Sequence, residues 1–582
     1  MDRINNTVHA AAAAMQHAVF DQHLREGAQH CTQESSADPS PCPEATQQPK
    51  LVVISNRVAS FDPLQPKTGG LAAALEPVVE RSGAVWMGSS DQLGNDSESF
   101  EIGQHGEGQV AKLDLPREHY SGYYEGFANS ILWPALHSLP DRMATSAKHY
   151  ESYQEINKFV ARAAFHFRDR DAIWVHDYHF LPLGAGLQNL GVGDKPIGFF
   201  LHTPWPAPDM MARVPNHREL MDSMLAYDLL GFQTNCDLKN FRDCLQIHLG
   251  LEVEHGVVIS ARGQTRCQKF PIGIDPKQFA QYASESLATQ DPYISSLLKK
   301  LNGAKLAIGV DRLDYTKGID ARVEAFDQVL ATEPRSIVLL QIANPSRTEI
   351  EAYKIYKRDV ESLVERVNDK HGTNEWRPVL YENSPFTQAQ LAGLYRAARV
   401  GVVTPLRDGM NLVAKEYVAA QDPNDPGVLV LSKFAGAAED FDQNEALLVD
   451  PTRPDEIAAA ISKAANMPRE ERVQRWRPMM DKIEAYTIHD WSADFVRELD
   501  KSRVTVPTDH FRHLGFGWIN EAQMPSYLTA DELDAALKRA MDRHWVLPPT
   551  SVADRAEASM NNRSGSDVYY FDGARSQGPT PS

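Results

Sequence analysis

Apolar residues occur along most of the chain in short runs, which alternate with longer segments where apolar residues follow a helical spacing. Short aliphatic and β-branched runs are typical of strands buried on both faces, and apolar residues three and four apart are typical of half-buried helices. This alternation predicts an α/β fold whose parallel sheets carry helices on both faces. The expected strands are residues 51–54, 85–88, 172–175, 196–201, 229–233, 305–310, 336–342, 379–381, 399–404, 428–431 and 446–449. The expected helices include residues 72–79, 151–165, 321–330, 350–367 and 476–500.

The pattern starts again after residues 271–276, which indicates two similar α/β domains. Both ends of the chain are polar and rich in small residues, so we expect extensions that are disordered at the N-terminus and partly disordered at the C-terminus. A helix is expected within the latter, at residues 529–544. The expected division is an N-terminal extension at 1–50, domains at 51–285 and 286–475, a helical segment at 476–503, and a C-terminal extension at 504–582.

Residues 404–421 bring the end of a strand, a turn and the start of a helix close together. Pro405 ends the strand, and Gly409 is expected to free the backbone before the helix. A helix start at the C-terminal edge of a strand offers free N–H groups, which suits a nucleotide or a sugar phosphate. Asp408 and Glu416 can accept hydrogen bonds from hydroxyl groups there. The alternative is that Asp408 only caps the helix and that Glu416 is only a solvated helix residue.

A second polar loop, residues 311–318, also follows an expected strand. Its cations, Arg312 and Lys317, suit a diphosphate whose negative charge grows as a glycosyl or phosphoryl bond breaks. The alternative is that both are surface cations paired with Asp311 and Asp314.

Histidines stand at the ends of two further strands, in His176-Asp177-Tyr178-His179 and at His202. Ligands of open α/β sheets bind at such ends, so we interpret these residues as hydroxyl-binding groups. A metal site is disfavoured, because the spacing is not a standard ligand pattern and no cysteine joins it.

Aromatic and cationic residues add to the candidate chemistry. Aromatic faces on which a sugar ring can pack come from Tyr123, Tyr124, Phe127 and Trp133, and core packing is the default interpretation for Phe127. Arg347 follows the expected strand 336–342 and is a candidate for an anionic second substrate. Gly69-Gly70 can let backbone N–H groups approach a phosphate, although two glycines alone favour a plain turn.

Composition narrows the class of protein. The 582 residues include 59 Lys and Arg against 78 Asp and Glu, a net charge of −19 that argues against generic affinity for nucleic acid or anionic membrane. No apolar run is long enough for a transmembrane helix, and the N-terminus lacks the apolar core of a secretory signal. A homo-oligomer stays open. Five cysteines without a C-x-x-C pair predict free thiols in the cytoplasm, and these are Cys31, Cys42, Cys236, Cys244 and Cys267.

Taken together, these motifs resemble the trehalose-6-phosphate synthases, which are retaining glycosyltransferases of family 20. The resemblance covers roughly residues 50–500 and implies a GT-B fold, in which two Rossmann-like doubly wound domains face each other across a cleft and the final helix returns to the first domain. It implies transfer of glucose from UDP-glucose to glucose 6-phosphate. The motifs, in the family's order, are Ser55-Asn56-Arg57, Gly69-Gly70-Leu71, Leu132-Trp133-Pro134, His176-Asp177-Tyr178-His179, 311–318 and 404–421.

The resemblance also implies a role for individual residues. The implied catalytic residues are Arg312 and Lys317 on the donor diphosphate, and His202 and Asp408 on the transferred glucose. Implied donor-binding residues are Gly69, Gly70, Phe386, Leu412, Val413, Ala414, Lys415 and Glu416, with Phe386 near the base and Glu416 on the ribose. Implied acceptor-binding residues are Arg57, Tyr124, Trp133, Asp177 and Arg347.

In the implied mechanism, the acceptor hydroxyl attacks the sugar from the face that the diphosphate leaves, and the leaving phosphate takes its proton. The sequence agrees in showing no evident carboxylate pair spaced for double displacement. No metal and no cofactor are expected, because UDP-glucose is a substrate. Some relatives carry a phosphatase domain with an Asp-x-Asp motif; Asp311 and Asp314 are one residue too far apart for it, so synthase activity alone is expected.

Two alternatives remain. Many relatives have a second Trp in a Trp-x-Gly-Trp segment, where this chain has Trp86-Met87-Gly88-Ser89. That difference motivates a related synthase with another phosphorylated acceptor, such as glycerol 3-phosphate or a cyclitol phosphate. From a different class, a non-catalytic sugar-phosphate sensor would keep the binding residues without turnover.

Overall fold

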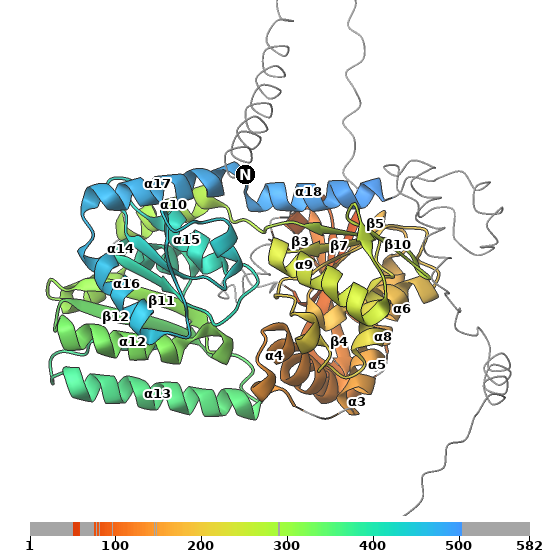
Figure 1. Ribbon diagram of the computed structural model, residues 1–582. Helices are drawn as coiled ribbons and strands as arrows, with labels where there is room; N and C mark the ends of the chain where they lie inside the picture. Colours follow the sequence, from red (N-terminus) through yellow and green to blue (C-terminus); the bar gives the residue numbers. More distant parts are fainter. Residues whose placement is uncertain are drawn as a thin grey trace, which may run out of the picture. The chain divides into compact units, whose positions relative to one another are not determined.

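A computed structural model describes residues 50–58, 75–76, 78–80, 82–95, 97–144, 146, 148–288 and 291–502. It contains two β-sheets with helices packed on them, which confirms the expected α/β class (Figure 1). The terminal extensions expected at 1–50 and 504–582, apart from Lys50, lie outside the described residues, as do the helix expected at 529–544 and the loop Gly69-Gly70. The five-part division of the chain stays a prediction.

The second sheet has six parallel strands in the order β13-β12-β11-β14-β15-β16. All six were expected from apolar runs, because the inner strands are buried on both faces and the two edge strands are partly buried. Along the chain they are β11 (Lys305–Arg312), β12 (Ile337–Asn344), β13 (Val379–Glu382), β14 (Val400–Val403), β15 (Val428–Ser432) and β16 (Leu447–Val449).

Helices cover both faces of this sheet (Figure 1). One apolar cluster joins Leu339 and Val402 to one set of helices, and a second joins Leu340 and Leu429 to another, because successive strand residues point to opposite faces. The first set is α12 (Ile319–Thr332), α13 (Glu351–His371) and α16 (Pro454–Asn466). The second set is α10 (Pro276–Ala288), α14 (Gln388–Ala397), α15 (Leu412–Ala420) and α17 (Arg469–Ala485). The short helix α11 (Pro292–Lys300) follows α10.

The first sheet has ten strands in the order β3-β4-β2-β1-β5-β6-β7-β10-β9-β8. Its expected strands are β1 (Leu51–Arg57), β2 (Val85–Gly94), β5 (Ala172–His176), β6 (Ile197–Phe200) and β7 (Leu229–Phe232), all parallel. Apolar runs did not reveal the outer strands, whose faces are partly exposed. These are β3 (Phe100–His105), β4 (Gly108–Pro116), β8 (Val253–Glu254), β9 (Val257–Ser260) and β10 (Gly263–Lys269). The β3–β4, β8–β9 and β9–β10 pairs are antiparallel, so the expected parallel strands of the first sheet are flanked by antiparallel pairs at both edges.

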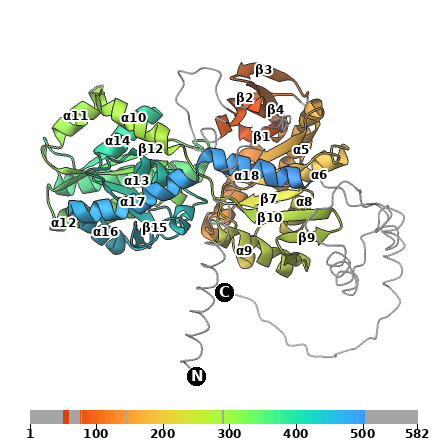
Figure 2. The ribbon, with the colours of Figure 1, turned by 90° about the horizontal axis from the view of Figure 1, so that it is seen from above.

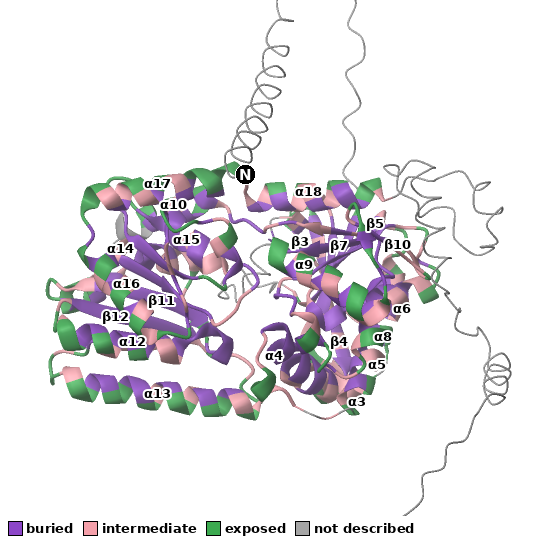
Figure 3. Cartoon of the chain, in the orientation of Figure 1, coloured by how far each residue is buried: buried purple, intermediate pink, exposed green. Residues whose placement is uncertain are grey.

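The helices around the first sheet bury one side and expose the other, as Figure 3 shows for α5 and α18. Residues 75–76 and 78–80 are helical, as expected for that stretch. The main helices are η1 (Ser121–Leu132, π-helical), α4 (Trp133–Leu136), α5 (Lys148–Ala164), α6 (Leu183–Asn189), α8 (His217–Met224) and α9 (Asn235–Cys244). Shorter turns are α3 (Arg117–Tyr120), η2 (Pro140–Arg142), η3 (Phe165–Phe167), η4 (Tyr178–Phe180), α7 (Pro208–Met211), η5 (Leu245–Leu249), η6 (Tyr315–Lys317) and η7 (Gly436–Glu439).

The expected single helix at 476–500 is two helices, α17 and α18 (Ile488–Lys501), so that expectation was wrong. Thr487 starts α18 with a capping box in which its hydroxyl and the Asp490 side chain bond each other's backbone N–H. The α18 helix lies on β7, as Figure 2 shows, and its Phe495 ring stacks on Trp174 of β5 with centroids 4.6 Å apart. Within the described part of the chain, no helix has both the length and the apolarity needed to cross a bilayer.

Candidate active site

The strand order of the second sheet reverses between β11 and β14. Ligands of open α/β sheets bind beyond the C-terminal ends of strands at such a reversal. The loop after β11 contains Lys317 and the loop after β14 contains Asp408, so both selected loops lie at this point. The Leu406 N–H donates to the Thr316 carbonyl at 2.8 Å and ties the loops together.

Lys317 and Asp408 form an ion pair between these loops, with side chains only 9% and 14% exposed. Asp408 also accepts hydrogen bonds from the Gly409 N–H and the Asn411 amide, both at 3.0 Å. Burial acts to raise the pKa of Asp408, but the Lys317 ammonium outweighs burial and holds the pKa below its ordinary value. Asp408 is therefore a fixed anionic acceptor.

The interpretation of Asp408 as a mere helix cap is wrong, because α15 begins after Asn411, the residue in the capping position, with φ of 65°. Gly409 also matters for a reason other than the one expected. Its φ is not in the left-handed region, but a Cβ on it would overlap the carbonyl oxygen of His202, which follows β6. The absence of a side chain at Gly409 thus lets the loop after β14 touch the loop after β6.

His202 contacts two residues at the end of β5, the buried His176 and the adjacent Asp177. Its Nε2 is 3.1 Å from Nδ1 of His176, and its backbone N–H donates to Oδ1 of Asp177 at 3.3 Å. Burial lowers the pKa of His202 to about 3, so its ring is neutral at pH 7. Burial raises the pKa of Asp177 to about 6, against backbone hydrogen bonds and the nearby cations Arg312 and Arg347.

Arg347 is a buried cation held by groups from both sheets. Its guanidinium pairs with Asp314 at 2.7 Å, accompanied by hydrogen bonds to the hydroxyls of Tyr353 (2.8 Å) and Tyr178 (3.0 Å). The guanidinium carbon lies 3.9 Å from the ring centroid of Trp133. Burial acts to raise the pKa of Asp314, but Arg347 and its neighbouring cations outweigh it and hold this pKa well below the ordinary range.

Arg312 differs from Arg347 in being exposed at the end of β11. Its guanidinium carbon is 5.3 Å from the centroid of the same Trp133 ring. Among the described residues, no carboxylate lies within ion-pair distance of Arg312. The alternative that both loop cations pair with their own loop's carboxylates is wrong, because Asp311 pairs with Arg322 and Asp314 pairs with Arg347.

Arg57 and Tyr124 lie together at the end of β1. The Arg57 guanidinium carbon is 5.9 Å from the Tyr124 ring, which stacks on the His179 ring at 5.9 Å. Arg57 is 61% exposed and also approaches Asp91 at 3.7 Å. Ser89, which stands where many relatives have Trp, accepts the Asp91 N–H at 3.2 Å.

Glu416 is not a solvated helix residue, so that alternative is wrong. Its carboxylate accepts a hydrogen bond from the Tyr395 hydroxyl at 3.2 Å. Burial raises the pKa of Glu416 to about 7, and this hydrogen bond opposes the shift only in part. The carboxyl is close to half protonated at neutral pH and can donate as well as accept.

The other implied donor residues differ in how they can meet a ligand. Leu412 and Val413 are partly buried and Ala414 is buried in the first turn of α15. First-turn N–H groups have no i−4 partner within a helix, although that of Ala414 donates to the Asn411 carbonyl at 3.3 Å. The Lys415 ammonium is bonded to the Ile272 carbonyl and to Asp440, both at 2.8 Å, which leaves its backbone as the donor contact. Phe386 is half-buried, and its ring meets that of Tyr293 edge-on.

Several site residues were not selected from the sequence. Arg347 is held by Tyr178, Tyr353 and Asp314. Of these three, only Asp314 had a sequence signal for a role in the site, which was its position in the loop after an expected strand. His137 is buried beside the Asp408–Lys317 pair; burial lowers its pKa to about 4, and its Nε2 has no hydrogen-bond partner. The helical spacing Trp133-x-x-x-His137 was a signal that could have identified it.

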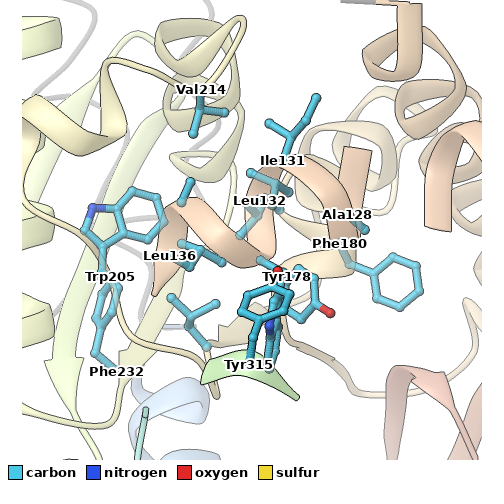
Figure 4. Close-up of a cluster of buried hydrophobic side chains, with 14 of the residues drawn as sticks. Ala128, Ile131, Leu132, Leu136, Tyr178, Phe180, Trp205, Val214, Phe232 and Tyr315 are labelled. Atoms are coloured by element: carbon cyan, nitrogen blue, oxygen red, sulfur yellow. The ribbon is translucent and has the colours of Figure 1, made fainter. Parts of the chain in front are cut away.

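An apolar cluster lies beneath these polar groups. Figure 4 shows Leu132 and Leu136 of η1 and α4 beside Trp205, with the rings of Tyr178 and Tyr315 close together. Tyr315 comes from the loop after β11, so residues of both sheets share this cluster. The cluster gives the loops a rigid support.

Backbone strain also marks the site. Asp177, Arg347 and Asn411 are non-glycine residues with φ of 73°, 50° and 65°. Such conformations cost about 1–3 kcal/mol each and concentrate at functional sites. The structure brings Arg312, Lys317, His202, Asp408, Trp133, Asp177 and Arg347 together through the contacts above.

Comparison with known protein families places the chain in a class. The model of glycosyltransferase family 20 matches residues 49–501, so the chain belongs to this family. A curated relative, the trehalose-6-phosphate synthase of Sinorhizobium fredii, is 41% identical over 463 residues, covering 78% of this chain and 98% of the relative.

Solved structures agree with this assignment. An α,α-trehalose-phosphate synthase (UDP-forming) from Burkholderia xenovorans, in complex with glucose-6-phosphate, matches with a TM-score of 0.74 and 37% identity, covering 78% of this chain and all of that chain. A structure titled as trehalose-6-phosphate from E. coli bound with UDP-2-fluoro glucose matches with a TM-score of 0.72 at 37% identity, covering 78% and 99%. The fold is GT-B, with two parallel-sheet domains, as expected.

Proposed function

We propose that this chain is a retaining trehalose-6-phosphate synthase that transfers glucose from UDP-glucose to glucose 6-phosphate and releases UDP. The observation that carries the proposal is the pair of cations at the β11–β14 reversal, Arg312 without a carboxylate partner among the described residues and Lys317 bonded to Asp408. The Asp408 carboxylate that binds Lys317 also accepts a hydrogen bond from Asn411, the residue before α15, and the chain belongs to family 20.

On the donor side, Arg312, Lys317 and the first N–H groups of α15 bind the diphosphate and stabilise its growing charge. Phe386 lies near the base and Glu416 bonds the ribose. The half-buried carboxyl of Glu416, with its pKa of about 7, supports this role because it can both donate to and accept from a diol. Gly69 and Gly70, also proposed here, lie outside the described residues.

On the acceptor side, Arg57, Tyr124 and Arg347 hold the phosphate of glucose 6-phosphate, while Trp133 and Asp177 hold its ring. Two observations support this role for Arg347. Asp314 and two tyrosine hydroxyls hold its guanidinium in a fixed position, and its Nε has no hydrogen-bond partner. An arginine fork suits a phosphate better than a flexible ammonium does.

The proposed reaction breaks the bond between C1 of glucose and the diphosphate oxygen and forms a bond from C1 to the acceptor 1-OH oxygen. The acceptor proton passes to the departing phosphate oxygen on the same face. Asp408 supports a route without a covalent intermediate, because its oxygens already accept bonds from Lys317, Gly409 and Asn411. The proposed role of Asp408, together with the neutral His202 ring, is to bind the hydroxyls of the transferred glucose.

The same proposal includes a cytoplasmic location, no cofactor and no metal in the reaction. Within the described residues, Cys236, Cys244 and Cys267 are free thiols, which supports a reducing compartment. His176, Asp177 and His179 do not form a group that could surround a metal ion.

The test measures UDP release from UDP-glucose with glucose 6-phosphate, glycerol 3-phosphate, a cyclitol phosphate or no acceptor, and then identifies the sugar product. We expect release only with glucose 6-phosphate and a non-reducing disaccharide phosphate as product. Release with another acceptor alone would assign a sister synthase. Binding of both ligands without any release would assign the sensor.

A second expected result concerns Glu416 and pH. Its pKa is raised to about 7 in the folded chain against about 4.3 when unfolded, so its stabilising contribution is complete below pH 4 and is lost as pH rises through 7. In Glu416→Gln this loss disappears. The free energy of unfolding of Glu416→Gln, minus that of the wild type, should therefore rise by about 2 kcal/mol from pH 4 to 8, less than the full shift because Glu416 is partly exposed.

Urea unfolding at several pH values measures this difference. Glu365→Gln is the matched control, because Glu365 is 62% exposed, and its difference should stay flat. A flat difference for Glu416→Gln as well would show that Glu416 titrates as an ordinary surface carboxylate.

A further inference from the structure

We propose that Glu76, Glu80 and His105 form a structural zinc site that joins the helical residues 75–76 and 78–80 to the β3–β4 hairpin. Glu76 and Glu80 lie one helical turn apart and therefore on one face. His105 ends β3 and points its Nε2 between them, at 3.3 Å from Oε1 of Glu76 and 3.4 Å from Oε1 of Glu80. One ligand atom from each residue lies within 4.8 Å of the others.

These distances are not those of a hydrogen-bonded ion pair. In this same chain, Nε2 of His371 lies 2.6 Å from Oδ1 of Asp327, as a histidine bonded to a carboxylate should. The Nε2 of His105 is buried and makes no hydrogen bond, although two carboxylate oxygens flank it at nearly equal distance. A ring nitrogen at nearly equal distance from two carboxylate oxygens, with all three atoms within 4.8 Å of one another, has the arrangement of a metal ligand.

The spacing selects the coordination geometry. Zinc binds histidine nitrogen and carboxylate oxygen at about 2.1 Å, and a tetrahedral angle then separates two ligand atoms by about 3.4 Å. An octahedral site with the same bond lengths would bring adjacent ligands to about 3.0 Å. The observed 3.3 and 3.4 Å match the tetrahedral value. Without cysteine, a site of one histidine and two carboxylates suits Zn²⁺ with water as the fourth ligand.

The backbone around the three residues is fixed before any ion binds. The turn after His105 packs on the helix, where the Glu107 N–H donates to the Glu80 carbonyl at 2.8 Å. Gly106, with φ of 59°, permits this approach, because a Cβ on it would lie 2.7 Å from that carbonyl oxygen. The ligands are thus held on two rigid elements, as a metal site requires.

Burial and charge also suit a dication. The side chains of Glu76 and His105 are 11% and 15% exposed, whereas Glu80 is 45% exposed and can rotate toward an ion. Two carboxylates and a neutral imidazole carry a formal charge of −2, which Zn²⁺ balances. Glu76 follows Gly69-Gly70 closely in sequence, so zinc would anchor helical residues that are near the proposed donor loop in the sequence. The inference does not depend on the proposed reaction.

The experiment strips the full chain with a chelator, removes the chelator, and measures Zn²⁺ binding by calorimetry and by metal content after dialysis. We expect one tight equivalent per chain and a higher unfolding temperature with Zn²⁺. His105→Gln and Glu80→Gln should each weaken the binding at least tenfold, since even residues behind the metal ligands change affinity by that much. His371→Gln, the matched control, should bind as the wild type does.

Co²⁺ in place of Zn²⁺ tests the geometry, because tetrahedral Co²⁺ absorbs visible light far more strongly than octahedral Co²⁺. The wild type and His371→Gln should show the intense spectrum, and His105→Gln should not. No tight equivalent in the wild type, or binding by His105→Gln and Glu80→Gln as tight as that of the wild type, would overturn the proposal and leave an ion-pair cluster. The circular dichroism of each variant checks its fold.

Discussion

Replacing Arg312 by Met should lower kcat/KM for UDP-glucose by about 10²–10³-fold and leave the free energy of unfolding almost unchanged. Removing one preorganised donor to a developing negative charge has this effect on rate. Stability should be spared because Arg312 is exposed and, among the described residues, has no carboxylate within ion-pair distance, so its loss leaves no buried charge unpaired. The contact of its guanidinium with Trp133 is the one that Met partly replaces.

Steady-state UDP release and urea unfolding measure the two quantities on the same samples. Arg335→Met is a control on another exposed arginine of the second sheet's domain and should change neither. Arg312→Lys should recover only part of the activity, because an ammonium cannot form the two parallel hydrogen bonds of a guanidinium. Near-normal turnover by a folded Arg312→Met chain would contradict its role on the diphosphate.

The pattern of the sequence predicted the strands that are buried on both faces. All six strands of the second sheet were expected, because each is an apolar run between polar loops. The edge strand β3 was not, because its residues are partly or fully exposed and have no long apolar run. Its pairing with β4 depends on the tertiary structure, which periodicity does not encode.

The sequence predicted which residues belong to the candidate site, but it did not predict which of them contact each other. Motif position identified Lys317 and Asp408 separately, but their ion pair joins residues far apart in sequence. The same holds for Arg347, whose partners Asp314 and Tyr178 come from loops of different sheets. Chain order gives no distance between such groups, and only the packed structure shows which charges are compensated.

The helix boundary at Thr487 illustrates a different limit. Apolar periodicity continues across it, so residues 476–500 looked like one helix. The Thr487–Asp490 capping box indicates a helix start in the sequence. The prediction of one helix was wrong because it used apolar periodicity alone.

Replacing Arg347 by Met should lower the free energy of unfolding by about 3–5 kcal/mol, the usual cost of breaking a buried ion pair at one partner. Asp314 is fully buried, and the Arg347 side chain is only 4% exposed. Without the guanidinium, the Asp314 carboxylate keeps its bonds from Thr316 but loses the charge that compensates it. Urea unfolding measures the loss, and any folded protein should show a raised KM for the phosphorylated acceptor.

A double-mutant cycle separates charge compensation from packing. Arg347→Met combined with Asp314→Asn removes both charges, so it should be at least about 1 kcal/mol more stable than Arg347→Met alone. Arg377→Met, which breaks an exposed pair with Glu365, should cost less than about 1 kcal/mol. If Arg347→Met cost no more than Arg377→Met, the buried pair would not be what fixes the loops after β11 and β12, and the acceptor site would need another support.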